Sequence, residues 1–233
     1  MNVITFCYES IRLWMRMTRV SVQLLYGFWR ISSVPRPIVS FFGGARPENV
    51  DPYFRKALAL SSRLVASGVS VLTGGGSGIM EAASCGIREE EDKVDPKHLG
   101  RSIGIGVKDL GEGSNPCVQE YFELDYFFAR KWLLTRYSDA IFVFPGGFGT
   151  LDELAETLTL IQTGKIPVVP IILIGSEYWE PFMHWLVKEA LHHGMVNKTE
   201  VDLFKVTDDL DEAYGWACAA CHDAMQAKKS KGR

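Results

Sequence analysis

Short apolar runs alternate with segments of helical periodicity from residue 38 to about residue 227. The runs are rich in Val, Ile and Phe, which favours buried strands at 38–42, 69–73, 102–107, 140–144 and 168–174, with a shorter one near 121–124. Apolar residues three or four positions apart predict helices over about 51–66, 78–88, 151–161, 177–193 and 209–227, with another that carries Arg130. The alternation predicts an α/β fold: a Rossmann-like, doubly wound, mainly parallel sheet with helices on both faces.

The 233 residues, 47% hydrophobic and 23% charged, are enough to bury one large core. We therefore expect a single Rossmann-like nucleotide-binding domain at 36–227 and a basic tail at 228–233. The charged insertion at 88–98 is expected to form a surface loop.

Residues 1–35 need a separate interpretation, because the stretch Glu9–Ile31 is strongly apolar. Four arginines interrupt it, and each costs about 2.5–3.5 kcal/mol at a bilayer centre, so we expect no membrane span. The stretch also lacks the order of a signal peptide. We expect a helix that packs on the domain or on a partner subunit, and attachment to a membrane surface is the alternative.

Glycine-rich turns follow three of the predicted strands, at Gly43–Ala45, Gly74–Gly78 and Gly146–Thr150. The carboxyl ends of parallel strands meet at one edge of a sheet, so these turns predict one ligand crevice. The third turn leads directly into a helix, whose free N–H groups and positive dipole end favour a phosphate. Glu153 is expected in the first turn of that helix. The alternative is a capping box, in which Thr150 caps the helix and Glu153 bonds back to it.

Two segments identify the chain as resembling the LOG ("Lonely guy") phosphoribohydrolases, a family long mislabelled as lysine decarboxylases. One is the pair Arg130-Lys131 followed by Pro145–Glu153, and the other is Thr73–Glu81. The similarity covers roughly residues 36–210, and Tyr126–Lys131 and Leu160–Lys165 are similar to the longer, bacterial branch. The resemblance implies hydrolysis of the N-glycosidic bond of nucleoside 5′-monophosphates, of the AMP type or cytokinin riboside monophosphates, to free base and ribose 5-phosphate. It also implies a homodimer or higher homo-oligomer, with sites near the subunit interface.

By position, the resemblance makes Arg130 and Glu153 the catalytic pair. A carboxylate can stabilise the positive charge that develops on the ribose and deprotonate the attacking water. Arg130 is too basic to be a general acid, but it can stabilise charge on the departing base. Glu156 shares the helix face of Glu153 and is either a second carboxylate of the site or an outward salt-bridge partner. The expected substrate-binding residues are Gly44, Ala45, Gly75, Gly76, Lys131, Gly146, Gly147, Phe148, Gly149, Thr150, Asp152 and Glu156.

The first glycine turn departs from the family pattern, which often places a serine after the first glycine. Gly44 stands there, so we expect the backbone N–H groups of Gly44 and Ala45 to hold phosphate in place of a hydroxyl.

Composition and spacing argue against several other functions. The net charge of −3 gives no basic footprint for nucleic acid. The five cysteines show no disulfide pattern, which favours a reducing, cytoplasmic location, and Cys85 and Cys117 are interpreted as small core or loop residues. The histidines show no metal-ligand grouping, so no metal is predicted. The glycine spacing fits neither a Walker loop nor a dinucleotide site, and nothing supports pyridoxal phosphate, so we expect no cofactor. A non-catalytic nucleotide or cofactor carrier on the same fold is the alternative function.

Overall fold

The computed structural model describes residues 3–46, 48, 50–110 and 113–231. Seven strands form one sheet in the order β4-β3-β2-β1-β5-β6-β7, and every adjacent pair is parallel. The strands are β1 (Ile38–Phe42), β2 (Ser70–Thr73), β3 (Ser102–Val107), β4 (Glu120–Leu124), β5 (Ala140–Val143), β6 (Ile171–Ile174) and β7 (Phe204–Thr207). The predicted Rossmann-like α/β fold is confirmed.

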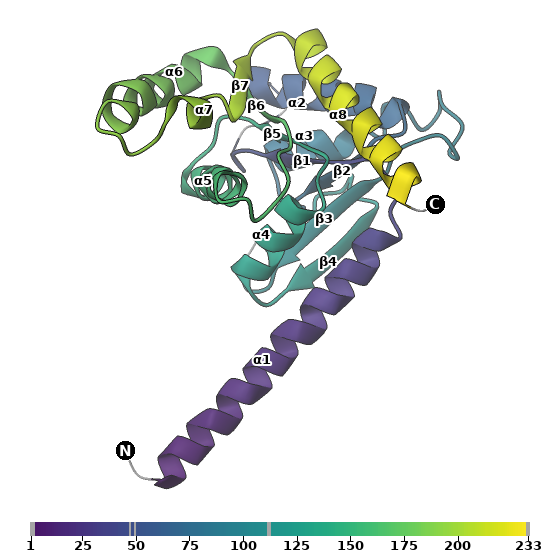
Figure 1. Ribbon diagram of the computed structural model, residues 1–233. Helices are drawn as coiled ribbons and strands as arrows, with labels where there is room; N and C mark the ends of the chain where they lie inside the picture. Colours follow the sequence, from purple (N-terminus) through teal and green to yellow (C-terminus); the bar gives the residue numbers. More distant parts are fainter. Residues whose placement is uncertain (1–2, 47, 49, 111–112, 232–233) are drawn as a thin grey trace.

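Helices cover both faces of this sheet (Figure 1). One apolar core packs α4 (Phe127–Arg136), α5 (Phe148–Gln162) and α6 (Ser176–Trp185) on one face. A second core packs α2 (Pro52–Ala66), α3 (Ile79–Cys85) and α8 (Leu210–Lys231) on the other. β1 shows how the sequence specifies both layers, since Ile38 and Phe42 point into the first core while Val39 and Phe41 point into the second.

The order of the strands reverses between β1 and β5. From β1 the chain builds β2, β3 and β4 outward on one side, and then crosses to build β5, β6 and β7 on the other. Such a switch point leaves a crevice at the carboxyl ends of the two central strands, which is where ligands bind in open α/β sheets. The glycine turns after β1 and β5 lie at this position.

Several predicted boundaries differ from the structure. The edge strand β7 was not predicted, because it has four residues and exposes Lys205. The apolar run at 168–174 forms a strand only from Ile171, since Pro167 and Pro170 cannot donate to a ladder. The predicted helix at 177–193 ends as α6 at Trp185 and continues as a π-helical turn, Leu186–Leu191. The short α7 (Lys198–Val201), with Asn197 as its cap, was also not predicted.

The first helix, α1 (Val3–Ser32), runs along the domain only at its C-terminal end, and its first half projects away from it (Figure 1). Ile31 is buried in the core beside α4, and Gly27 lets the two helices approach, because a Cβ there would overlap Leu133. Arg19 forms an ion pair with Asp125 at 2.5 Å. No helix in the described part of the chain is long and apolar enough to cross a membrane.

The prediction that the cysteines form no disulfide is wrong for one pair. Cys85, the last residue of α3, is bonded to Cys117 in the loop before β4. Their separation of 32 positions matches no recognisable spacing, because the pairing depends on how α3 and this loop meet at the sheet edge.

Candidate functional site

The turn between β5 and α5 places bare backbone amides at the mouth of the crevice. Gly147 caps α5, and the first hydrogen bond of the helix runs from Leu151 N–H to the Gly147 carbonyl at 3.1 Å. The amides of Phe148, Gly149 and Thr150 therefore precede the intrahelical bonds and lie at the positive end of the helix dipole. Phe148 is 93% exposed, so this end of α5 is open to a ligand. An anion is the ligand that such a site favours.

Gly146 is required here by close packing. A Cβ on this residue would overlap the Thr150 side chain and lie 2.8 Å from the Gly44 amide nitrogen. At Gly147 and Gly149, by contrast, a Cβ would meet open space. The first glycine therefore brings the turns after β1 and β5 together, and the next two leave room for a ligand.

The predicted helix start was too late, and two expectations change with it. α5 begins at Phe148, so Thr150 is its third residue, and no side chain caps the helix. The capping-box alternative for Thr150 and Glu153 is therefore wrong. Glu153 is the sixth residue and lies in the second turn, not the first, with its side chain 13% exposed.

The first two glycine turns form hydrogen bonds with other residues of the chain that the sequence did not indicate. Gly44 N–H donates to the Pro145 carbonyl at 2.9 Å, and Gly75 N–H donates to Thr73 Oγ1 at 3.0 Å. The Gly44 amide is therefore not free to hold phosphate, contrary to the expectation. The Ala45 carbonyl accepts from the Ser77 hydroxyl at 2.8 Å. These bonds shape the crevice.

Asn115 was not singled out from the sequence. Its Nδ2 donates to the carbonyls of Gly75 and Gly76 at 3.0 and 2.9 Å, and its Oδ1 accepts from Cys117 N–H at 3.1 Å. The residue is buried and fixes the second glycine turn to the loop before β4. Only an Asn-Pro pair in an otherwise irregular loop marked it, and that pair is also common in simple turns.

Arg130 and Glu153 come together between α4 and α5. Arg130 Nη2 lies 3.6 Å from Glu153 Oε1, and both side chains are nearly buried. The guanidinium lies over the Phe127 ring at 4.9 Å from its centroid. It also reaches the second glycine turn, since a Cβ on Gly74 would lie 3.5 Å from Nη1. Arg130 Nε is buried and has no hydrogen-bond partner among the residues that the structure describes.

The surroundings of Glu153 change its acidity. Burial disfavours the ionised form and raises its pKa from 4.5 to about 7, although the charges of Arg130 and Lys131 act in the opposite direction. A carboxyl group with a pKa near neutrality can accept and release a proton at physiological pH, as a general base requires.

Lys131 lies between two carboxylates of α5. Its Nζ is 2.9 Å from Asp152 Oδ2 and 2.5 Å from Glu156 Oε2. Burial lowers the pKa of Lys131, but its hydrogen bonds to Glu156 and Asp152 outweigh this effect and leave the pKa raised. The amine is therefore held protonated and is a poor nucleophile. Of the two alternatives for Glu156, the contacts favour the salt-bridge partner.

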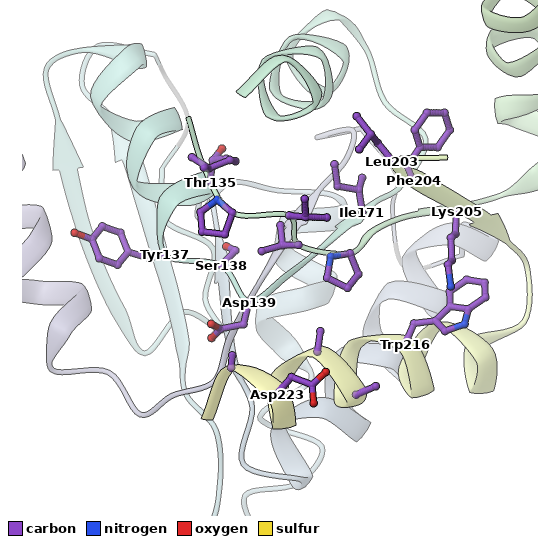
Figure 2. Close-up of a pocket in the computed structure, with 18 of the residues that line it drawn as sticks. Thr135, Tyr137, Ser138, Asp139, Ile171, Leu203, Phe204, Lys205, Trp216 and Asp223 are labelled. Atoms are coloured by element: carbon purple, nitrogen blue, oxygen red, sulfur yellow. The ribbon is translucent and has the colours of Figure 1, made fainter. Parts of the chain in front are cut away.

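A cavity at another position in the described chain does not include this site (Figure 2). Its volume is about 980 Å³, and Asp139, just before β5, and Phe204, the first residue of β7, contribute to its wall. It therefore opens at the amino ends of the strands, on the opposite edge of the sheet from the glycine turns. In the described residues, no group of three or more His, Cys, Asp or Glu side chains is arranged to hold a metal ion.

Fold and site together define an α/β protein with a helix end of free backbone amides and a largely buried Arg–Glu pair near a topological switch point. The family model described as "Possible lysine decarboxylase" matches residues 80–215. The chain belongs to this family, which includes the LOG proteins.

Relatives support the assignment. The chain is 28% identical to the cytokinin riboside 5′-monophosphate phosphoribohydrolase LOG2 of Arabidopsis thaliana, over 69% of this chain and 73% of that protein. It is 30% identical to the probable enzyme of the same description, LOGL3, of Oryza sativa subsp. japonica, over 67% of this chain and 71% of the relative.

Among solved structures, the molybdenum cofactor carrier protein of Chlamydomonas reinhardtii shares the fold. Its TM-score is 0.54 at 22% identity, and the match covers 79% of this chain and 98% of that one.

Proposed function

We propose that the protein hydrolyses the N-glycosidic bond of nucleoside 5′-monophosphates, releasing free base and ribose 5-phosphate. The observation that carries the proposal is the buried Glu153, with a pKa of about 7, beside Arg130 and two helical turns or less from the free amides of α5. The names of the plant relatives describe the same reaction.

The 5′-phosphate binds at the N-terminus of α5. The amides of Phe148, Gly149 and Thr150 donate to its oxygens, and the helix dipole favours the dianion. Gly146 lets this turn pack closely against the turn after β1, and Gly147 leaves it uncovered. Gly75, Gly76 and Ala45 form the facing wall. Binding energy from the phosphate holds the ribose where the chemistry occurs.

Glu153 acts on the ribose and on water. As the bond between base and sugar breaks, positive charge develops on the ribose, and the carboxylate stabilises it. The same group accepts a proton from the attacking water, which forms the new bond to the ribose carbon while the base leaves with the bonding electron pair.

Arg130 stabilises the negative charge on the departing base and holds Glu153 in place. Arg130 Nε, which has no hydrogen-bond partner in the described part of the chain, supplies a buried donor for the substrate. The guanidinium stays protonated throughout, so the proton that the base needs comes from another donor, such as water.

Lys131, Asp152 and Glu156 act together as a support for this pair. The lysine fixes α4 against α5 through both carboxylates and so keeps the spacing between Arg130 and Glu153. We place Lys131, Asp152 and Glu156 around the substrate and assign no proton transfer to these three residues.

We further propose substrates of the AMP type or cytokinin riboside monophosphates, the latter linking the protein to cytokinin activation. A homodimer with its sites near the subunit interface and a cytoplasmic location remain parts of this proposal, with no metal and no cofactor.

The experiment is to incubate the full chain with AMP, GMP, CMP and a cytokinin riboside monophosphate, and to separate free base by chromatography. Release of base and ribose 5-phosphate in equal amounts supports the proposal. Nucleotide binding with no base released from any of the four favours the second candidate, a carrier, for which the likeness to the Chlamydomonas carrier protein supports only the fold.

A further inference from the structure

One face of α1 carries apolar side chains at alternating spacings of three and four. The α1 seam consists of Tyr8, Ile11, Met15, Thr18, Val22, Leu25 and Trp29, and all seven side chains are exposed. This spacing is the a and d pattern of a coiled coil, sustained over about three heptads. Leu25 is 67% exposed and Trp29 65%, although both belong to the half of α1 that lies against the domain.

The seam is exposed along its length because the domain packs against a different face of the helix. Asp125 N–H donates to Gln23 Oε1 at 3.0 Å, and the Tyr26 ring meets Phe122 edge-on at 5.7 Å. Arg30 is 3.8 Å from Glu120. At 100° per residue, Gln23 and Arg30 lie about 100–120° from the middle of the seam and Tyr26 lies at its edge, so the domain leaves most of the seam free for another helix.

The seam is large enough to require a partner. An aromatic side chain buries about 150–250 Å². The exposed two thirds of Trp29 and of the flanking Trp14 therefore amount to roughly 200–330 Å². With the aliphatic seam residues, one copy approaches the about 800 Å² that a standard interface takes from each partner. Monomeric proteins rarely leave an apolar patch of this size uncovered.

The hydroxyl groups near the middle of the seam are compatible with burial. The Thr18 hydroxyl donates to the Trp14 carbonyl at 3.0 Å, and the neighbouring Ser21 hydroxyl donates to the Met17 carbonyl at 3.0 Å. Both donors are satisfied inside the helix, and both side chains are small, so a second helix can approach closely at the middle of the seam.

The charges of α1 favour a protein partner over an anionic membrane. Arg19 and Arg30 are paired with carboxylates of the domain, and Arg12 is 3.4 Å from Glu9. Among the residues that the structure describes, Arg16 alone of the four arginines has no carboxylate partner, whereas binding to an anionic surface gains from each basic residue held near it. The chain as a whole is negative, with a net charge of −3.

We propose that the α1 seam pairs with the α1 seam of a second copy of this chain, forming a two-helix coiled coil. The pairing does not depend on the proposed enzymatic activity. It is also separate from the crevice, because the seam lies on the N-terminal helix and the Arg130–Glu153 pair lies between α4 and α5.

The test compares Leu25→Glu with Arg16→Glu in the full chain. Both changes place the same side chain at an exposed position of α1, one in the seam and one on the opposite, polar side. Light scattering coupled to size exclusion should show that Leu25→Glu halves the mass of the wild-type particle, while Arg16→Glu leaves it unchanged. Circular dichroism and base release should be unchanged in both variants. Equal masses for all three proteins would overturn the pairing.

If Leu25→Glu fails to fold, chemical crosslinking tests the pairing instead. In a Cys7→Ser background, a short bis-maleimide should crosslink Thr18→Cys into dimers, but not Arg16→Cys. The two variants crosslinking alike would contradict the seam. Wild-type protein that stays monomeric but sediments with vesicles of anionic phospholipid would also overturn it, in favour of membrane-surface attachment.

Discussion

Arg130 and Glu153 face each other between two helices, with Nη2 of the arginine 3.6 Å from Oε1 of the glutamate. The distance is longer than a hydrogen bond, and the burial of Glu153 raises its pKa despite the neighbouring positive charge. The pair is therefore not a saturated salt bridge. At this spacing, both groups keep unused hydrogen-bonding capacity.

Glu153→Gln should reduce base release from AMP by about 10²–10⁴-fold, because the amide keeps the shape of the side chain but cannot accept a proton. Nucleotide affinity, measured by calorimetry, should stay within a few-fold of the wild type. Glu156→Gln is the matched control, one turn further along α5, and should retain far more activity. A Glu153→Gln variant that turns over at the wild-type rate would remove this carboxylate from the chemistry.

Base release should rise with pH as Glu153 ionises, with a midpoint near its pKa of about 7. In Arg130→Lys the positive charge is kept at a different geometry, whereas in Arg130→Ala it is lost. Since the arginine lowers the glutamate pKa, the alanine variant should shift the rising limb to higher pH and also lower the maximal rate. A pH profile of kcat/KM measures both effects. An unshifted profile with an undiminished rate would place Arg130 outside the site.

The same pKa makes stability depend on pH. Folding raises the Glu153 pKa from 4.5 to about 7, so in this window the folded state holds a proton that the unfolded chain has released. The free energy of unfolding should therefore fall as pH rises from 4.5 to 7, by on the order of 3 kcal/mol at most. Denaturant titrations of the wild type and Glu153→Gln should diverge across this range, with the variant the more stable above pH 7. Parallel curves would indicate that the carboxyl is not desolvated in solution.

Adenosine should be a poor substrate compared with AMP, because the amides at the start of α5 contribute binding energy only when a phosphate is present. Initial rates at equal concentrations test this, and inorganic phosphate should act as a weak competitive inhibitor of AMP hydrolysis. Adenosine cleaved as fast as AMP would contradict the assignment of the α5 N-terminus as the phosphate site.

Gly146→Ala and Gly147→Ala form a matched pair in the turn before α5. The first Cβ would overlap Thr150 and crowd the Gly44 amide, while the second meets open space. Gly146→Ala should lower the melting temperature by several degrees, as expected for about 1–3 kcal/mol of overpacking. Gly147→Ala should leave the melting temperature close to that of the wild type. Equal melting temperatures would mean that the turn is looser than its packing indicates.

The sequence alone determined the fold class and the edge of the sheet at which the glycine turns lie. Apolar runs at 38–42 and 102–107 became β1 and β3 with unchanged bounds, because a strand buried on both faces must be apolar throughout. The glycine turns after β1, β2 and β5 pointed to one edge of the sheet, because parallel strands all end there. Arg130 and Glu153 were singled out as a pair through the resemblance to the LOG family, because the motifs around Arg130-Lys131 and Pro145–Glu153 match that family's pattern.

Only the tertiary structure decided how these pieces meet. The Gly44 amide is engaged by Pro145, about a hundred positions away, and no local pattern encodes that contact. The bond between Cys85 and Cys117 and the support that Asn115 gives to Gly75 likewise depend on which segments the sheet brings together. The raised pKa of Glu153 also depends on the tertiary structure. Desolvation is caused by everything packed around a group and not by its neighbours in the chain. Sequence periodicity specifies which face of an element is buried, but the partner that covers that face is chosen only when all the elements pack together.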